Sequence, residues 1–241
     1  MPHDAPDGEE LHVSVRRFDA VSLDFYGTIS AGDRDAVEAT CCCIVEACDL
    51  PVIPQELAIR WGEQFFDLIE RSNHDAFQTL YECELGSLRT TLAGFGINRD
   101  PAPFVAKLEE YWANPPIYAD AIGFLNGVDL PVCCVSNADT KPLLAAIEKH
   151  DLRFDAVITS EVARCYKPDP GIFRRAVEVV GVRPERMLHI GDSLHSDVGG
   201  AARLGIATAW LRRENRIHDI GNCQPEYTLA TLAELSRLLS G

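Results

Sequence analysis

Five polar residues in this chain of 241 residues stand where their side chains can do chemistry together. Asp24 and Ser136 each end an apolar segment. Lys167 follows a third such segment, and Asp192 and Asp197 follow a fourth. A carboxylate can act as a nucleophile or a metal ligand, and a lysine can stabilise negative charge in a transition state. One aspartate at a strand end is commonly a helix cap, but four polar strand ends in one chain indicate a catalytic site.

The apolar segments alternate with helical ones from residue 118 onward. Strand-like segments lie at 18–25, 131–136, 155–159, 187–190 and 206–211, and helical segments at 140–149, 170–181 and 197–204. This alternation predicts an α/β fold with five parallel strands. Ligands of such sheets bind beyond the carboxyl ends of the strands, where the five polar residues stand.

The segment from 33 to 114 has a different pattern. It contains no convincing strand, and apolar residues such as Leu57, Trp61 and Leu68 recur at helical spacing after the helix-start signal Pro54. Further helices are predicted at 34–48, 75–94 and 102–113. The sequence therefore predicts a helical lobe inserted after the first strand.

The order of the polar motifs resembles that of the haloacid dehalogenase-like hydrolase superfamily. The motifs are Asp-x-x-Gly-Thr from Asp24, Ser136-Asn137, Lys167-Pro168, and Gly191-Asp192-Ser193 followed by Asp197. The resemblance spans almost all of 18–240 and implies the superfamily branch with a helical cap. It implies a Rossmann-like core at 17–32 and 115–241 and an α-helical cap at 33–114, and the acidic, Pro- and Gly-bearing segment at 1–16 is expected to be a flexible tail.

The resemblance implies that Asp24 is the nucleophile of a phosphatase and forms an aspartyl-phosphate intermediate. Family members that act on phosphate esters hold Mg²⁺, here with Asp24, the backbone carbonyl of Tyr26 and Asp192. This is an all-oxygen ligand set, which suits magnesium.

The resemblance gives the other motif residues supporting roles. Ser136 and Asn137 would bind the transferred phosphoryl group, and Lys167 would neutralise charge between the phosphate and the carboxylates. Asp197 would orient Lys167 or a metal-bound water. Thr28 and Ser193 are further supporting residues. The expected partner is a small phosphorylated molecule whose identity the sequence does not give.

Tyr26 departs from the phosphatase pattern. Most phosphatases of the superfamily carry a second aspartate at this position, where it protonates the leaving oxygen. Tyrosine, with an ordinary pKa near 10, is a poor acid–base group at neutral pH. Tyr26 remains a candidate catalytic residue, and its presence predicts a slow enzyme, a good leaving group or a substitute acid elsewhere.

Two alternatives remain open at this point. Asp-x-Tyr-Gly-Thr also resembles the 2-haloacid dehalogenases, which displace halide without a metal. Asp192 argues against them, because an extra carboxylate beside Asp24 repels an anionic substrate. The other alternative is a weakly active binding or regulatory member of the superfamily. Carbon–phosphorus cleavage is less favoured, because it needs a cap lysine and Lys107 is the single lysine between 33 and 114.

Composition excludes several other classes of protein. The chain carries 37 acidic and 22 basic residues, a formal charge of -15, which disfavours nucleic acid and anionic membranes as partners. The nine cysteines form no paired metal or disulfide pattern and suit a reducing cytoplasm. No apolar segment reaches the ~18 residues needed to span a bilayer. We expect a monomer or a homodimer. His189 is expected to pack in the core and His195 to lie in a solvent-facing loop, and Arg212-Arg213 is assigned no role.

Overall fold

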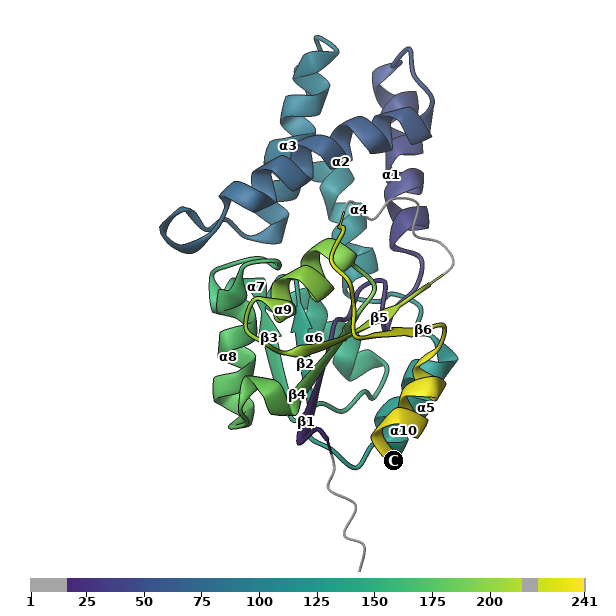
Figure 1. Ribbon diagram of the computed structural model, residues 1–241. Helices are drawn as coiled ribbons and strands as arrows, with labels where there is room; N and C mark the ends of the chain where they lie inside the picture. The colour runs from purple at the N-terminus through teal and green to yellow at the C-terminus, as the bar shows by residue number, and fades with distance from the viewer. Residues whose placement is uncertain (1–16, 214–220, 241) are drawn as a thin grey trace, which may run out of the picture.

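The computed structural model describes residues 17–213 and 221–240, so the predicted tail at 1–16 lies outside the described residues. A sheet of six strands, with helices on both faces, lies below a helical lobe in the view of Figure 1. The strands are β1 (Ala20–Leu23), β2 (Val132–Ser136), β3 (Ala156–Thr159), β4 (Met187–Gly191), β5 (Ala207–Leu211) and β6 (Tyr227–Leu229). The fold is therefore α/β and Rossmann-like, as predicted.

All neighbouring strands in the sheet are parallel, in the order β3-β2-β1-β4-β5-β6. In this register Val21 of β1 lies opposite Val132 of β2 on one side and Leu188 of β4 on the other. The carboxyl ends of β1, β2 and β4 therefore lie next to one another. These are the strands that end at Asp24, Ser136 and the Asp192 loop.

The two faces of the sheet bury separate apolar clusters, because successive strand side chains point to opposite faces. Val21, Leu23 and Cys134 pack on the face covered by α5 (Ala119–Gly127), α6 (Thr140–Lys149) and α10 (Leu232–Ser240). Ala20 and Cys133 pack on the other face, against α8 (Pro170–Val180) and α9 (Gly200–Ala202). The adjacent cysteines are thus buried on opposite faces and act as small apolar core residues. The short helix α7 (Ser160–Ala163) and the turns η2 (Pro184–Arg186) and η3 (Leu194–Gly199) complete the core.

The helical lobe consists of α1 (Asp33–Cys48), α2 (Pro54–Arg71), the turn η1 (His74–Ala76), α3 (Leu80–Gly94) and α4 (Ala102–Trp112). It has its own apolar core, which includes Leu57, Trp61, Leu88 and Leu108. It joins the sheet lobe through the segments before α1 and after α4, and stands over the carboxyl ends of the strands (Figure 1).

Two predicted helices differ from the structure, and some elements were not predicted. The helix predicted over 75–94 is two elements, because Thr79 and Glu82 form a capping box that starts α3 at Leu80. Helix 197–204 is instead the π-helical turn η3 followed by the short α9. The strand β6 and the helices α5, α7 and α10 were not predicted.

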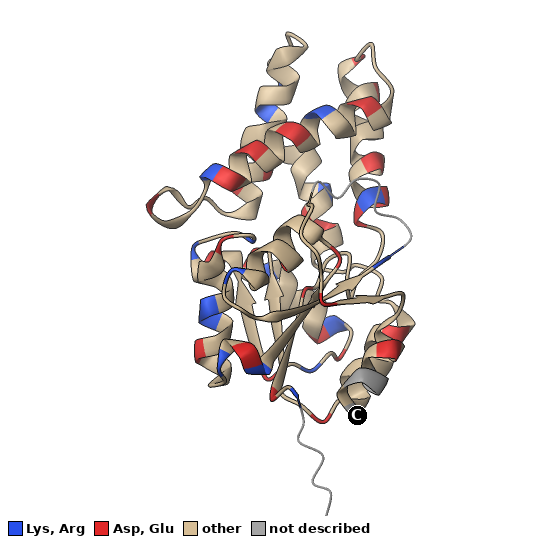
Figure 2. Ribbon diagram, viewed as in Figure 1, with Lys and Arg blue, Asp and Glu red and all other residues tan. Residues whose placement is uncertain are grey.

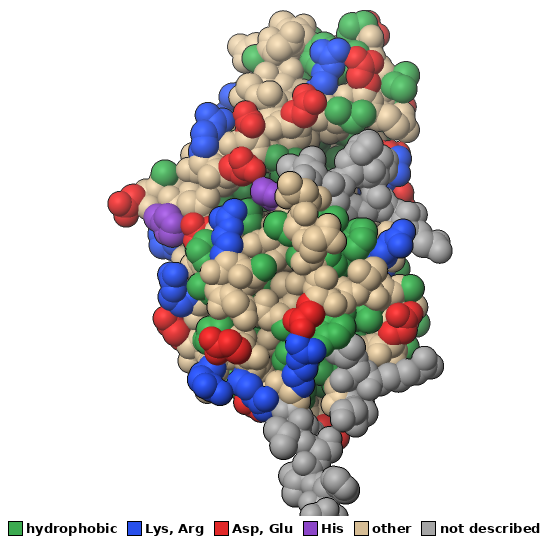
Figure 3. All heavy atoms as spheres, in the orientation of Figure 1, with side chains coloured by type: hydrophobic (Ala, Val, Ile, Leu, Met, Phe, Trp, Pro, Cys, Tyr) green, Lys and Arg blue, Asp and Glu red, His purple; other side chains and the backbone are tan. Residues whose placement is uncertain are grey.

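Charged side chains are distributed over both lobes (Figure 2). On the face drawn in Figure 3, acidic and basic side chains are interspersed among the coloured residues, so the basic ones on that face form no continuous surface for a polyanion. In the described ranges, no helix combines the length and the apolar composition that a membrane crossing requires.

Candidate active site

Asp24 follows β1 directly and is held there by a hydrogen bond from its backbone N–H to the carbonyl of Ile190 on β4, at 2.9 Å. Its carboxyl group is buried. Oδ1 accepts a 2.6 Å hydrogen bond from Nζ of Lys167, whereas Oδ2 has no hydrogen-bond partner in the described chain. A buried oxygen without a partner is uncommon, and here it belongs to the residue predicted to be the nucleophile.

Lys167 is 3% exposed and carries the ammonium group at the centre of the site. Nζ lies 2.6 Å from Asp24 Oδ1 and 2.6 Å from Asp197 Oδ1, and also donates to the carbonyl of Val135 at 3.0 Å. The side chain of Asn137 holds the Lys167 backbone, since Oδ1 accepts from its N–H at 2.7 Å and Nδ2 donates to its carbonyl at 3.1 Å. In this structure the Asn137 side chain therefore positions Lys167.

Asp197 connects Lys167 to a buried histidine. Asp197 Oδ1 also lies 3.1 Å from His189 Nε2, and His189 Nδ1 lies 2.9 Å from the hydroxyl of Ser22 on β1. Asp197 Oδ2 accepts from the Ser193 N–H, while the Ser193 hydroxyl starts η3 by accepting from Ser196 N. His189 is buried in the core, as expected, and it also contacts the Asp24–Lys167–Asp197 cluster through Asp197.

The pKa values of Asp24 and Asp197, the two carboxyl groups that pair with Lys167, shift in opposite directions from their ordinary value. Burial raises the pKa of Asp24 above its ordinary value, and repulsion from Asp197 adds to the effect, although Lys167 opposes it. Burial alone would also raise the pKa of Asp197, but Lys167 and His189 together lower it below its usual range. Burial acts to lower the pKa of Lys167, and the two carboxylates outweigh it and raise that pKa. Lys167 is therefore a fixed positive charge.

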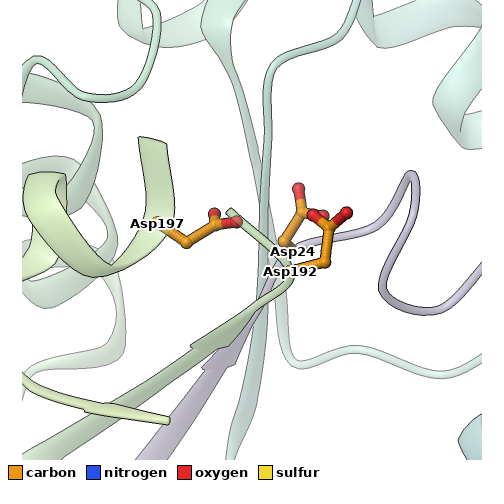
Figure 4. Close-up of side chains that lie close together, drawn as sticks. All are labelled: Asp24, Asp192 and Asp197. Carbon is orange, nitrogen blue, oxygen red and sulfur yellow. The ribbon is translucent and has the colours of Figure 1, made fainter. Parts of the chain in front are cut away.

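Asp192 brings a third carboxyl group to the cluster. One carboxylate oxygen each from Asp24, Asp192 and Asp197 lies within 4.8 Å of the others. Figure 4 shows the carboxyl groups of Asp24 and Asp192 side by side, with that of Asp197 approaching from η3. Gly27 permits this arrangement, because a Cβ there would lie 2.6 Å from Asp192 Oδ2.

This donor set fits a magnesium ion. Asp24 and Asp192 supply adjacent buried carboxylates, and Asp24 Oδ2 has no partner from the described chain. Asp197 is occupied by Lys167, His189 and the Ser193 N–H, so it suits an orienting role better than a ligand role. Hard oxygen ligands with a small number of carboxylates are what Mg²⁺ prefers.

The Tyr26 hydroxyl is not placed to transfer a proton to or from a substrate. Its hydroxyl donates a 2.7 Å hydrogen bond to the backbone carbonyl of Trp112, at the end of α4. Burial raises the pKa of Tyr26 well above its usual value, and the negative groups around it, including Glu109 and Asp24, raise it further. The phenol stays protonated at any physiological pH, and its hydrogen is already donated to the Trp112 carbonyl.

The hydroxyl of Ser136, at the end of β2, is a second buried polar group without a hydrogen-bond partner among the described residues. The strand neighbour of β2 is β1, so Ser136 lies at the same edge of the sheet as Asp24. A buried hydroxyl without a protein partner suits contact with a substrate oxygen.

Arg213 is a site residue that sequence analysis missed. Its Nη2 and Nε donate to the carbonyl of Thr28 at 2.8 and 3.2 Å, and its Nη1 and Nη2 pair with the carboxylate of Asp120 at 2.9 and 3.1 Å. The guanidinium lies 3.9 Å from the ring centroid of Tyr118. Arg213 thus anchors the loop that follows Asp24. No local motif marks it, because its partners are distant in sequence.

Several hydrogen bonds dock the helical lobe on this edge of the sheet. Asp139, in the loop after β2, accepts from the backbone N–H groups of Leu80 and Tyr81 at 2.8 and 3.0 Å, at the start of α3. The Tyr166 hydroxyl donates to the Gln78 carbonyl at 2.8 Å. His195 belongs to the same boundary, since its Nε2 lies 3.5 Å from Glu70 Oε1 of α2 and its side chain is partly exposed.

Three comparisons place these features among known proteins. A family model described as haloacid dehalogenase-like hydrolase matches residues 18–205. The (S)-2-haloacid dehalogenase 1 of Pseudomonas sp. (strain CBS-3) is 23% identical over 226 residues, covering 91% of this chain and 96% of that protein. The pyrimidine 5'-nucleotidase YjjG of Escherichia coli is 32% identical over 125 residues, covering 49% and 55%.

Solved structures share the whole architecture. The HAD-hydrolase YfnB from Bacillus subtilis, solved bound to magnesium, superposes with a TM-score of 0.75 at 20% identity and covers 94% of this chain and 100% of that one. At this identity the likeness shows the fold alone. The relatives include both dehalogenases and phosphatases, so similarity by itself leaves the leaving group undecided.

Proposed function

Because this chain belongs to the haloacid dehalogenase-like hydrolases, we propose that it is a Mg²⁺-dependent phosphatase of a small phosphomonoester, with Asp24 as the nucleophile. The supporting observation is the charge of the cluster. The carboxylates of Asp24, Asp192 and Asp197 lie within 4.8 Å of one another, and Lys167 pairs with Asp24 and Asp197. Carboxylates this close repel one another, and Asp24 Oδ2 has no partner in the described chain, so a divalent cation beside Asp24 and Asp192 would be favourable.

In this mechanism the residues of the candidate site act directly on the substrate. One carboxylate oxygen of Asp24 attacks the phosphorus atom, the bond from phosphorus to the leaving oxygen breaks, the leaving oxygen takes a proton from solvent, and an aspartyl phosphate forms. Ser136 and the Asn137 backbone bind the phosphoryl oxygens, and Lys167 stabilises their charge. Water then cleaves the aspartyl phosphate and returns Asp24 to its carboxylate form. Asp24, Asp192 and the Tyr26 carbonyl would hold Mg²⁺, which would supply further positive charge to stabilise the phosphoryl group.

Tyr26 limits which phosphomonoesters are expected to be hydrolysed quickly. Its hydroxyl is bonded to Trp112 and its pKa is raised, so it does not replace the usual acid. We therefore expect the fastest turnover for leaving groups that depart without a strong acid. The helical lobe, at 33–114, acts as a cap that excludes water and selects the substrate.

A metal-independent 2-haloacid dehalogenase is the second candidate. It is favoured by the similarity to the Pseudomonas enzyme over almost the whole chain and by Tyr26 itself. Its substrate is an anion that would meet Asp192 in the same cluster as Asp24, which is electrostatically unfavourable without a cation.

One assay separates the two candidates. The purified protein is incubated with p-nitrophenyl phosphate and, separately, with 2-chloropropionate, each with Mg²⁺ or with EDTA, and phosphate and halide release are measured. We expect phosphate release that requires Mg²⁺. Halide release that survives EDTA would identify a dehalogenase, and binding without release of either product would identify a binding protein.

Asp192→Asn tests the metal assignment directly. The change removes a carboxylate charge but keeps a similar shape, so the Mg²⁺ concentration for half-maximal activity should rise by about tenfold or more. Asp155→Asn, a change in the loop before β3 at the opposite end of the strands, is the matched control and should leave the Mg²⁺ titration unchanged. An unchanged titration for Asp192→Asn would remove Asp192 from the ligand set.

A further inference from the structure

Tyr166 belongs to the sheet lobe, but its side chain packs inside the helical lobe and is 1% exposed. The other buried members of its apolar cluster all come from the helical lobe, and they are Ile69, Leu80 and Cys83. The Tyr166 ring stacks on that of Phe77, with centroids 5.4 Å apart, and its hydroxyl donates a 2.8 Å hydrogen bond to the Gln78 carbonyl. Tyr166 therefore links the loop between α7 and α8 to the helical lobe.

Two asparagines bind the backbone N–H groups of Tyr166 and of the next residue, Lys167. Oδ1 of Asn73, in the helical lobe, accepts from the N–H of Tyr166 at 2.7 Å. Oδ1 of Asn137, in the loop after β2, accepts from the N–H of Lys167 at 2.7 Å. Asn73 is itself fixed, because its Nδ2 donates to the Glu70 carbonyl in the last turn of α2 at 3.0 Å. Both lobes therefore hold the backbone that places Lys167.

The turn η1 of the helical lobe contacts the same loop on both sides of Lys167. The backbone N–H of His74 donates a 2.7 Å hydrogen bond to the Arg164 carbonyl, and His74 Nε2 lies 3.0 Å from Asp169 Oδ2. The guanidinium of Arg164 lies 5.2 Å from the ring centroid of Phe77. A movement of the helical lobe would therefore be transmitted to the loop that carries Lys167.

The position of the Lys167 ammonium group depends on the backbone that carries it. The lysine side chain is a flexible four-carbon stem, and here Nζ lies 2.6 Å from both Asp24 Oδ1 and Asp197 Oδ1. A group that stabilises charge in a transition state acts because it is already in place, and a displacement of ~1 Å can lower a rate by about 10²-fold. Loss of support for the Lys167 backbone should therefore lower the rate of the chemical step.

We propose that Tyr166 is a positioning residue that makes the place of the Lys167 ammonium group depend on docking of the helical lobe. This inference rests on the proposed function, in which Lys167 stabilises the charge of the phosphoryl group. An undocked lobe takes away the apolar cluster around Tyr166 and the acceptor that Asn73 offers to its N–H, so the loop loses its support on that side. Turnover then requires the lobe to be docked over the bound substrate.

The first test follows Lys167 itself and needs no enzymatic activity. The protein is treated briefly with N-hydroxysuccinimidyl acetate, and acetylation of Lys167 is measured by mass spectrometry relative to Lys149, which is exposed on α6. Tyr166→Leu loses the ring and the hydroxyl, so acetylation of Lys167 should rise by about tenfold. Leu92→Ala, which opens a cavity in the separate core of the helical lobe, is the control and should leave Lys167 protected. Unchanged protection in Tyr166→Leu, or equal increases in both variants, would overturn the inference.

The second test measures hydrolysis of p-nitrophenyl phosphate with Mg²⁺, per folded molecule. Tyr166→Leu should lower kcat by about tenfold or more with KM changed little, because Lys167 acts in the transition state. Tyr166→Phe keeps the ring in its cluster and should retain most of kcat, and Leu92→Ala should retain all of it. Equal losses in Tyr166→Leu and Leu92→Ala would show a general effect of lobe stability and would overturn the inference. Failure of the wild type to release phosphate would instead overturn the phosphatase function, and the acetylation of Lys167 would still decide whether Tyr166 positions it.

Discussion

The hydroxyl of Tyr26 donates a hydrogen bond to the backbone carbonyl of Trp112, and the two rings pack edge to face with centroids 4.9 Å apart. The contact joins the loop after β1 to the last turn of α4. Tyr26 therefore occupies the place of the usual second aspartate, two residues after Asp24, but ties the helical lobe to the sheet. The hydrogen bond and the ring contact hold the last turn of α4 against the loop that follows Asp24.

Tyr26→Phe should affect stability more than chemistry. The variant keeps the ring contact but loses the hydrogen bond, so the free energy of unfolding should fall by about 0.5–1.5 kcal/mol. Urea denaturation measures this change. The pH profile of p-nitrophenyl phosphate hydrolysis should keep its shape, because a phenol with so high a pKa does not titrate in the range studied. Tyr111→Phe, which removes a similar 2.8 Å bond to the Ala31 carbonyl, is the control. Loss of one limb of the profile for Tyr26→Phe alone would make Tyr26 an acid or base.

Glu84→Gln should make the protein more stable in alkaline solution. Because the pKa of Glu84 is raised to about 8 in the folded protein, the folded state holds a proton that the unfolded state releases near pH 4.5. Wild-type stability should therefore fall as the pH rises from about 4.5 through 8, and glutamine should not show this fall. Chemical denaturation of both proteins at pH 5 and pH 8 measures the difference, which should be larger at pH 8. A difference independent of pH would contradict the raised pKa.

The sequence predicted the fold and which polar residues gather at one edge of the sheet, because both depend on local signals. Apolar segments of strand length, broken by polar residues, predicted β1 to β5. Their alternation with helices predicted that the strands run parallel. Asp24 and Asp192 directly follow strands, Lys167 lies in the loop between α7 and α8, and each belongs to a recognisable motif. Parallel pairing then brings them to one edge of the sheet.

Features that depend on distant partners were not predicted. Strand β6 is three residues long and pairs at the sheet edge, so it carries little periodic signal. Arg213 is defined by bonds to Thr28 and Asp120, and Glu84 by a bond to Trp112, all across long stretches of sequence. A charged residue in a helix is ordinarily exposed, so a buried Glu84 could not be expected from local sequence.

Arg213→Lys should weaken metal binding without unfolding the protein. Lysine keeps the charge but cannot bind both the Thr28 carbonyl and the two oxygens of Asp120, so the loop carrying the Tyr26 carbonyl should loosen. The Mg²⁺ concentration for half-maximal activity should rise by about tenfold. Arg186→Lys, which alters a similar two-contact pair with Asp19 at the amino ends of the strands, should leave that concentration unchanged. Equal effects of the two changes would reduce Arg213 to a general stabilising role.

Asp24→Asn should abolish turnover and yet leave the fold at least as stable as the wild type. The amide cannot form the aspartyl phosphate, so phosphate release should fall to the background rate. The pKa of Asp24 is raised in the folded protein, which means that ionisation of its carboxyl group destabilises the fold once the pH exceeds its ordinary value near 4. Asparagine removes that charge and leaves Lys167 paired with Asp197.

Asp197→Asn is the control for Asp24→Asn. Asp197→Asn removes the carboxylate whose pKa is lowered in the folded protein, so its charge stabilises the fold above pH 4 and the variant should be less stable at pH 7. The two substitutions remove the same charge from the two partners of one lysine, and they should shift the midpoint of thermal unfolding in opposite directions. Shifts of the same sign and size would mean that Lys167 holds both carboxylates equally. In that case the charge excess at Asp24, on which the proposed cation site rests, would lose its support.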